Sequence, residues 1–245
     1  MIVRRGRDTA PRPVGPSRLF AWAGRTRYYF PSTGAAAVSP GFDTGYEDTS
    51  IATRLRTVTT KISSAMTTVD FTDLDTTDRD VLFRQYVGDP LVAQTINAQD
   101  VRLQMRGIET LAINNMFLTW VLKIVSNDGS TVRGILVAIR RDGTELDTVL
   151  TNRGDLATIA SLAILDGDRP VIEIGTGGIP TVSVHSSSLR IGDADATDLP
   201  EDDTTTADNN PWLEFQQILQ FQVEILQSSS SPWQNRGQFA PLLAQ

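Results

Sequence analysis

Short runs in which apolar and polar residues alternate recur along the chain from about residue 26 to residue 226. This period of two is typical of β-strands that turn one face towards a core. The clearest pair of runs covers residues 117–126 and 131–140, joined by Asn127-Asp128-Gly129-Ser130, whose Asp-Gly step favours a turn with positive φ. The sequence predicts a β-hairpin here. The inward faces would carry Leu118, Trp120, Leu122 and Ile124 on the first strand and Ile135, Val137 and Ile139 on the second.

Further runs of this kind predict the remaining strands. They cover residues 27–30, 55–62, 81–87, 100–107, 145–150, 158–165, 171–174, 181–184 and 213–226. A helix is the alternative for residues 212–226, but the alternation there favours a strand. No repeat of fixed period is present, which argues against a solenoid or propeller. Many short strands with almost no helical signal predict an all-β fold, a two-sheet antiparallel jelly-roll-like β-sandwich with extended N- and C-terminal arms.

The two ends of the chain lack the strand pattern. Residues 1–24 contain three prolines and three glycines without any hydrophobic period, which predicts an extended arm. The sandwich domain is then expected over residues 25–227, and an extended tail over residues 228–245. Because ordering an extended segment costs entropy, its binding should depend on a few apolar anchors. The predicted anchors are Phe20, Trp22, Trp233, Phe239 and Leu242.

Charge is distributed unevenly. The net charge is −7, yet residues 1–30 carry seven arginines and one aspartate, so the remaining chain carries −13. Four of these arginines are predicted to contact partners: Arg4, Arg5, Arg7 and Arg12. The acidic body opposes the approach of DNA, so direct nucleic-acid binding is not expected. An acidic loop at residues 193–208 offers a neighbouring subunit's arginine arm a complementary surface, although charge runs are commonly just solvated.

Composition removes several classes of function. The absence of cysteine excludes disulfides, thiolate metal ligands and cysteine nucleophiles. His185 is the only histidine, which removes most zinc sites and leaves any catalytic triad dependent on one residue. No apolar run approaches the roughly 20 residues that span a bilayer, and no signal peptide follows the basic start. We expect a soluble protein made in the host cytoplasm, without cofactor, metal or membrane contact.

The segments that could carry chemistry each have a plainer interpretation. Residues 70–80 contain five aspartates but lack the glycine and terminal glutamate of a calcium-binding EF-hand loop, which predicts a solvated acidic turn. Gly175-Thr176-Gly177-Gly178 lacks the Lys-Ser/Thr of a phosphate-binding loop and is also predicted to be a turn. Glu173 and Glu224 could form a glycosidase acid pair, but alternation places both towards solvent.

His185 is followed by three serines without a G-x-S-x-G elbow, so it is predicted to be an exposed or hydrogen-bonded turn residue. No enzymatic activity is therefore expected, and a glycan hydrolase or esterase is the least favoured hypothesis. Exposed aromatic rings could form a platform on which a sugar stacks, and Tyr28 and Tyr29 are two candidates for it, together with Trp120 and Trp212. Trp120 is expected in the core, whereas Trp212 and Trp233 are expected at the surface. A carbohydrate-binding host-adhesion module is therefore the alternative function.

Several stretches resemble a group of jelly-roll-type virion structural proteins of tailed bacteriophages. They are residues 27–32 (RYYFPS), 38–40 (VSP), 84–87 (RQYV), 89–96 (DPLVAQTI), 168–174 (DRPVIEI), 192–199 (GDADATDL) and 211–215 (PWLEF). The resemblance implies a structural component of the virion, such as a head decoration, collar, fibre or baseplate subunit. It implies a homo-oligomer in a symmetric assembly, with other virion structural proteins as partners. None of these motifs is catalytic, so no site residue is carried over.

Overall fold

The computed structural model describes residues 24–74, 76–179, 184–194, 197–201 and 203–222. Within these ranges the chain forms thirteen β-strands and no helix, which confirms the predicted all-β class. No helix suited to crossing a membrane occurs in this part of the chain. The predicted contact residues lie outside the described ranges: Arg4, Arg5, Arg7, Arg12, Phe20, Trp22, Trp233, Phe239 and Leu242. The proposed boundaries of the arm, sandwich and tail stay predictions.

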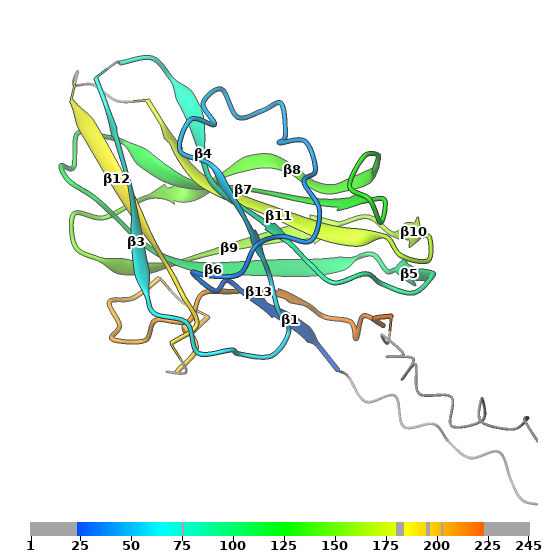
Figure 1. The fold of residues 1–245 in the computed structure, drawn as a ribbon. Coiled ribbons are helices and arrows are strands. Elements are labelled where there is room, and N and C mark those ends of the chain that lie inside the picture. The colour runs from blue at the N-terminus through cyan, green and yellow to red at the C-terminus, as the bar shows by residue number, and fades with distance from the viewer. Residues whose placement is uncertain (1–23, 75, 180–183, 195–196, 202, 223–245) are drawn as a thin grey trace, which may run out of the picture.

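Two large sheets form the body of the molecule (Figure 1). The first sheet contains β3 (Thr67–Asp73), β12 (His185–Ile191), β6 (Gln99–Glu109) and β9 (Thr151–Ile159), and it is extended by β13 (Trp212–Phe215) and β1 (Thr26–Tyr29). The second contains β2 (Thr53–Arg56), β4 (Arg79–Val87), β11 (Arg169–Gly178), β7 (Met116–Val125) and β8 (Val132–Glu145). A small ladder joins β5 (Gln94–Ile96) to β10 (Leu162–Ile164).

The order of the main strands is that of a jelly roll. Read along the chain, the eight principal strands are β3, β4, β6, β7, β8, β9, β11 and β12. The first, eighth, third and sixth form one sheet, and the second, seventh, fourth and fifth form the other. This interleaving is the double Greek key of a jelly-roll sandwich. The predicted fold is therefore confirmed, with one departure, because β2 joins β4 in parallel.

Side chains from both sheets meet in one core. The predicted inward face of β7 is confirmed, since Leu118, Trp120, Leu122 and Ile124 are all fully buried. From β6, Val101, Leu103 and Met105 pack against the same core. On β8 the prediction holds only partly, because Val137 is buried while Ile135 is 54% exposed. Register shifts between β7 and β8 interrupt the simple alternation of β8.

Several predicted strand boundaries were wrong. Residues 146–150 form a loop rather than a strand, and β9 begins only at Thr151. Residues 158–165 are divided between β9 and β10, and β13 ends at Phe215 instead of continuing through residue 222. The predicted strand at residues 55–62 corresponds to the shorter β2. Of the predicted strand at residues 181–184 only Val184 is described, and it lies just before β12.

The outer face of the second sheet is covered by the segment between β1 and β2, through Val38, Phe42 and Tyr46. A buried ion pair fixes this cover, with Lys123 Nζ 2.8 Å from Glu173 Oε1. Lys123 also donates to the Gly41 carbonyl at 2.9 Å, and the Asp43 amide donates to Glu173 at 3.0 Å. Glu173 was predicted to face solvent, but it is fully buried. Alternation failed here because the covering segment makes both faces of the sheet interior.

Candidate functional site

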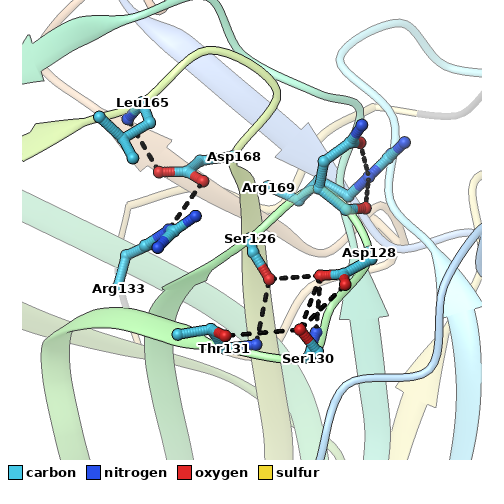
Figure 2. A network of polar contacts seen from close by, with 9 residues as sticks. Ser126, Asp128, Ser130, Thr131, Arg133, Leu165, Asp168 and Arg169 are labelled. Carbon is cyan, nitrogen blue, oxygen red and sulfur yellow. Dashed lines mark hydrogen bonds and ion pairs between the residues drawn. The ribbon is translucent and has the colours of Figure 1, made fainter.

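A polar cleft of about 470 Å³ lies at the end of the sandwich formed by the β7–β8 and β10–β11 loops (Figure 2). Its walls are Ser126, Asn127, Asp128, Ser130, Thr131, Arg133, Asp166 and Asp168. The first six belong to the hairpin that the Asp-Gly signal predicted. Gly129 has φ 76°, which confirms the turn with positive φ.

Asp128 organises one wall of the cleft. Its Oδ1 accepts hydrogen bonds from Ser126 Oγ at 2.5 Å, from the Ser130 amide at 3.0 Å and from Ser130 Oγ at 2.9 Å. These donors stabilise the carboxylate and lower the pKa of Asp128 to about 2. The Thr131 amide in turn donates to Ser126 Oγ at 3.0 Å. The hairpin loop therefore satisfies its polar groups largely by itself.

Asp168 organises the opposite wall. Its Oδ1 accepts from Arg133 Nε at 3.2 Å, and its Oδ2 accepts from the Leu165 amide at 2.8 Å. Arg169 connects the two walls by donating from Nε to the Asn127 carbonyl at 3.0 Å. Figure 2 shows these contacts as three neighbouring groups: Asp168 with Arg133 and Leu165, Asp128 with the hairpin serines and Thr131, and Arg169 with the hairpin residue Asn127. The sequence signalled the hairpin but not the cleft, because its second wall comes from a loop about 40 residues further along the chain.

The chemistry available in this cleft is hydrogen bonding. A serine nucleophile needs a nearby base whose pKa lies close to the working pH. Asp128, with its low pKa, is far too weak a base for Ser126 or Ser130. No aromatic ring is among the cleft's lining residues, so it offers no stacking surface for a sugar. Across the described part of the chain, no group of three or more acidic, histidine or cysteine residues is arranged to hold a metal ion.

His185 lies elsewhere and is not the predicted turn residue. It begins β12, is 3% exposed, and places Nε2 3.7 Å from Asp73 Oδ2. Its neighbour Ser187 bonds instead to Thr176 on β11, with 2.7 Å between the hydroxyl oxygens. Among the described residues no serine hydroxyl hydrogen-bonds the imidazole, so the serine–histidine arrangement of a hydrolase is not formed.

Two other predicted turns contain strand residues. Within the acidic segment 70–80, β3 extends to Asp73 and β4 begins at Arg79, and buried Asp73 pairs with Arg79. The glycine-rich segment 175–178 forms the second half of β11. A Cβ on Gly175 would lie 1.9 Å from the Val81 carbonyl oxygen. Glycine is needed there because β4 approaches β11 closely, which single-sequence patterns do not distinguish from a turn.

The acidic loop at residues 193–208 forms ion pairs with basic residues of the same chain. Asp198 lies 2.9 Å from Arg27 and 3.1 Å from Lys61, and it accepts a hydrogen bond from the Tyr29 hydroxyl at 2.9 Å. Glu201 lies 3.6 Å from Arg25. Two basic residues counted in the first 30 therefore neutralise part of this loop. The predicted contact with a neighbour's arm stays a prediction.

Trp212 was predicted at the surface but is fully buried. Its Nε1 donates to the Leu199 carbonyl at 2.7 Å, and the guanidinium of Arg27 covers its ring with 3.9 Å between Cζ and the ring centroid. Tyr28 is buried as well, whereas Tyr29 is only partly buried. The predicted aromatic platform therefore does not form from Trp212 and Tyr28, and Trp233 lies outside the described residues.

A second cleft, of about 260 Å³, lies at the opposite end of the sandwich, where β6 approaches the β8–β9 connection. Its lining includes the acids Glu109, Glu145 and Asp147 and the base Arg153. Glu109 is 1% exposed, and its Oε2 accepts a hydrogen bond from the Met116 amide at 3.1 Å. Burial and the neighbouring negative charge of Glu145 raise the pKa of Glu109 to about 7. Arg153 pairs with Asp142 at 3.2 Å.

Comparison with known proteins gives only distant similarities. No family model and no curated protein matches the chain. A CocE/NonD family hydrolase from Staphylococcus aureus is 9% identical, with a TM-score of 0.39 over 65% of this chain and 34% of that one. An α-amino acid ester hydrolase is 9% identical, with a TM-score of 0.28 over 53% and 24%. A structure of infectious bursal disease virus Gx strain is 10% identical, with a TM-score of 0.25 over 74% and 41%.

The chain thus spans less than half the length of each of these structures. At such low identities and scores the similarities do not support a functional assignment. Function must be argued from the molecule's own surfaces.

Replacing Glu109 with glutamine is expected to stabilise the protein above neutral pH. The pKa is raised in the folded state from an ordinary value of 4.5, so the wild-type protein loses stability as the pH rises from about 4.5 to about 7. Glutamine keeps the acceptor for Met116 without this cost. We expect a gain of about 1–3 kcal/mol in the free energy of unfolding at pH 8 and none at pH 4, measured by urea denaturation. Equal gains at both pH values would contradict this explanation.

Replacing Gly175 with alanine is expected to cost about 1–3 kcal/mol of stability, because the added methyl group meets the backbone of β4. Gly143, also a glycine in a strand of the second sheet, has no atom within 4 Å of an added Cβ and provides the matched control. Thermal unfolding of both variants tests this. Similar melting temperatures for the two variants would show that the close approach is not limiting.

Proposed function

We propose that this chain is a non-enzymatic structural subunit of a virion, which binds neighbouring proteins through one end of its jelly roll. The supporting observation is a cluster of exposed aliphatic side chains in the loops that follow β3, β6, β8 and β11 and in the residue before β12. We call this cluster the apolar loop end. It comprises Leu74 (74% exposed), Leu111 (52%), Ile113 (51%), Val149 (55%), Ile179 (57%) and Val184 (57%).

Hydrogen bonds hold these loops together. Asn115 Nδ2 donates to the Ile179 carbonyl at 3.3 Å, which joins the β6–β7 loop to the loop after β11. Asn114 Nδ2 donates at 3.2 Å to the carbonyl of Ser186, which is two residues after Val184. Half of the twelve exposed large hydrophobic residues among the described ranges lie in this one region. Such clustering marks a surface that binds another protein, whereas isolated exposed residues need no explanation.

The interior polar groups support a structural role. Two buried ion pairs, Lys123–Glu173 and Arg153–Asp142, are closed within the interior, and the cleft around Asp128 has its serines bonded to an aspartate of low pKa. Jelly rolls are common in viral capsids, which is an argument by analogy. The assignment to a tailed bacteriophage, as head decoration, collar, fibre or baseplate subunit, depends on the resemblance of residues 27–32, 168–174 and 211–215. The expected location is the virion.

Locating the chain in purified particles tests this proposal. Mass spectrometry of gradient-purified particles should detect it at a fixed stoichiometry to the major capsid protein. A low-resolution map of the particle should then place its density at symmetric positions. If the chain is found only in the soluble fraction of infected cells, the proposal is wrong.

Carbohydrate binding through hydrogen bonds alone, without ring stacking, is the second candidate, and the hydroxyl and carboxylate groups that line the cleft around Asp128 favour it. A glycan array probed with the full chain, with and without calcium, should show binding that the Asp128→Asn variant loses. Absence of binding in both conditions eliminates this candidate.

A further inference from the structure

We propose that the apolar loop end of one copy binds the C-terminal segment, residues 223–245, of another copy. This inference rests on the proposed role as an assembly subunit and adds to it the identity of the partner. It follows from three features: where the described chain ends, which side chains the segment carries, and which charges surround the apolar loop end.

The described chain ends at the opposite end of the sandwich from the apolar loop end. The Gln222 amide donates to the Pro90 carbonyl at 2.9 Å, and its side-chain Nε2 donates to Asp166 at 2.8 Å. Both partners lie beside the ends of β4 and β11 that are remote from the apolar loop end (Figure 1). The strand β6 has 11 residues and is therefore roughly 36 Å long, and it runs most of the way between the two ends of the sandwich. The segment therefore starts far from its own copy's apolar loop end.

The segment has the composition of a docking peptide. After the serine run at residues 228–231, its prolines and large apolar side chains are Pro232, Trp233, Phe239, Pro241, Leu242 and Leu243. Beyond Glu224 its only charged side chain is Arg236, which lies between Trp233 and Phe239. Tryptophan and arginine are the residue types that most often dominate binding energy at protein interfaces. With 23 residues it can extend up to about 75 Å, enough to reach a neighbouring copy.

The apolar loop end complements this composition in charge as well as in hydrophobicity. The second cleft opens beside it, since Ala112, between Leu111 and Ile113, is one of the lining residues, and the carboxyl groups of Glu109, Glu145 and Asp147 also line it. The one basic lining residue, Arg153, already pairs with Asp142. Arg236, which lies between Trp233 and Phe239 in the sequence, therefore complements the charge of the second cleft, and the two aromatic side chains complement the exposed aliphatic residues of the apolar loop end.

We propose the contact between copies rather than within one copy. To reach its own apolar loop end, the segment would have to run back along the length of the sandwich. The outer face of the second sheet, one such path, is already covered by the segment that contains Val38, Phe42 and Tyr46. Because the tail and its binding surface lie at opposite ends of the sandwich, the contact either is exchanged reciprocally within a two-fold dimer or continues from copy to copy in a ring or filament.

Cysteine cross-linking tests the contact directly, because the natural chain contains no cysteine. Full-length Ala112→Cys, on the β6–β7 loop, is mixed with full-length Ala240→Cys under mild oxidation. We expect a disulfide-linked heterodimer within minutes, at least tenfold faster than with Val132→Cys, a control on β8. Val132 is 52% exposed, like Leu111 beside the test position. Equal rates for test and control would overturn the proposal.

A second measurement separates the possible occupants. Sedimentation of the full-length chain should show self-association that weakens at least tenfold in Leu111→Asp/Ile113→Asp and in Trp233→Ala/Phe239→Ala. Val132→Asp/Ile135→Asp serves as the matched control, and urea unfolding verifies that all variants fold. If only the loop-end variant dissociates, the occupant is a different segment, and a synthetic peptide of residues 1–23 tests the arginine arm.

The remaining outcomes are also decisive. If a chain carrying both cysteines closes within one monomer, at a rate independent of concentration, the segment binds in cis and the proposal is wrong. If the chain stays monomeric in every variant, the contact between copies does not exist. The virion assignment is tested separately by the particle map, so its failure is distinguishable from the failure of this contact.

Discussion

Replacing Lys123 with methionine is expected to lower the free energy of unfolding by about 3–5 kcal/mol. The substitution leaves the carboxylate of Glu173 buried without its ion-pair partner, 2.8 Å away in the wild-type protein. It also removes the hydrogen bond to the Gly41 carbonyl, which anchors the covering segment. Urea denaturation monitored by circular dichroism gives the change.

The controls for Lys123 come from the same chain. Lys61, the only other lysine, pairs with Asp198 near the surface, and Lys61→Met should cost no more than about 1 kcal/mol. Adding Glu173→Gln to Lys123→Met should recover most of the loss, because the neutral amide no longer requires a cation. If the double variant is as unstable as the single one, lost packing rather than unpaired charge explains the effect.

Replacing Trp120 with alanine is expected to cost about 3–5 kcal/mol, because the indole is fully buried between the two sheets. Its Nε1 also donates to Asp155 Oδ2 at 2.6 Å, which joins β7 to β9 across the sandwich. Trp120→Phe should cost less than Trp120→Ala. Its loss of the hydrogen bond to Asp155 should contribute about 1–2 kcal/mol, in addition to the effect of the change in side-chain volume, because Arg140 continues to pair with Asp155 at 2.8 Å. Thermal and urea unfolding of both variants measure the difference.

Equal losses for alanine and phenylalanine at position 120 would show that the hydrogen bond, not the volume of the ring, dominates. The Arg140→Gln variant then becomes informative, because Asp155 would keep only its tryptophan donor. We expect that variant to be destabilised by less than Trp120→Ala, since a side chain that is 39% exposed is easily replaced by water.

The runs that form β6 and β7, each with an alternating set of apolar residues, were predicted from the sequence, whereas β9 was not. For β7 the inward face was predicted residue by residue, and for β6 the alternating run 100–107 was predicted as a strand. β9 was missed because it buries Asn152, Arg153 and Asp155, whose polarity hides the period of two. Glu173 and Trp212 were placed at the surface because the groups that cover them, Lys123 and Arg27, come from other strands.

The candidate sites also contain some features that the sequence predicted and others that it did not. The Asp-Gly turn of the first cleft was predictable because its conformation depends on adjacent residues. Asp168, its second wall, and the pairing of Glu109 with Glu145 depend on strand order, which local patterns do not specify. The apolar loop end consists of single aliphatic residues in separate loops, and only the fold brings them together.

The pairing of β1 with β13 has a consequence for synthesis of the protein. Thr26 is opposite Phe215, so about 190 residues separate the partners. At about 5–20 residues per second, a ribosome needs roughly 10–40 s between making the first strand and making the second. From the synthesis of β6 until β13 follows, in the later part of that interval, the edge of β6 that receives β13 stays open to wrong pairing. A chaperone that binds nascent chains would therefore act on this protein mainly before residue 215 emerges.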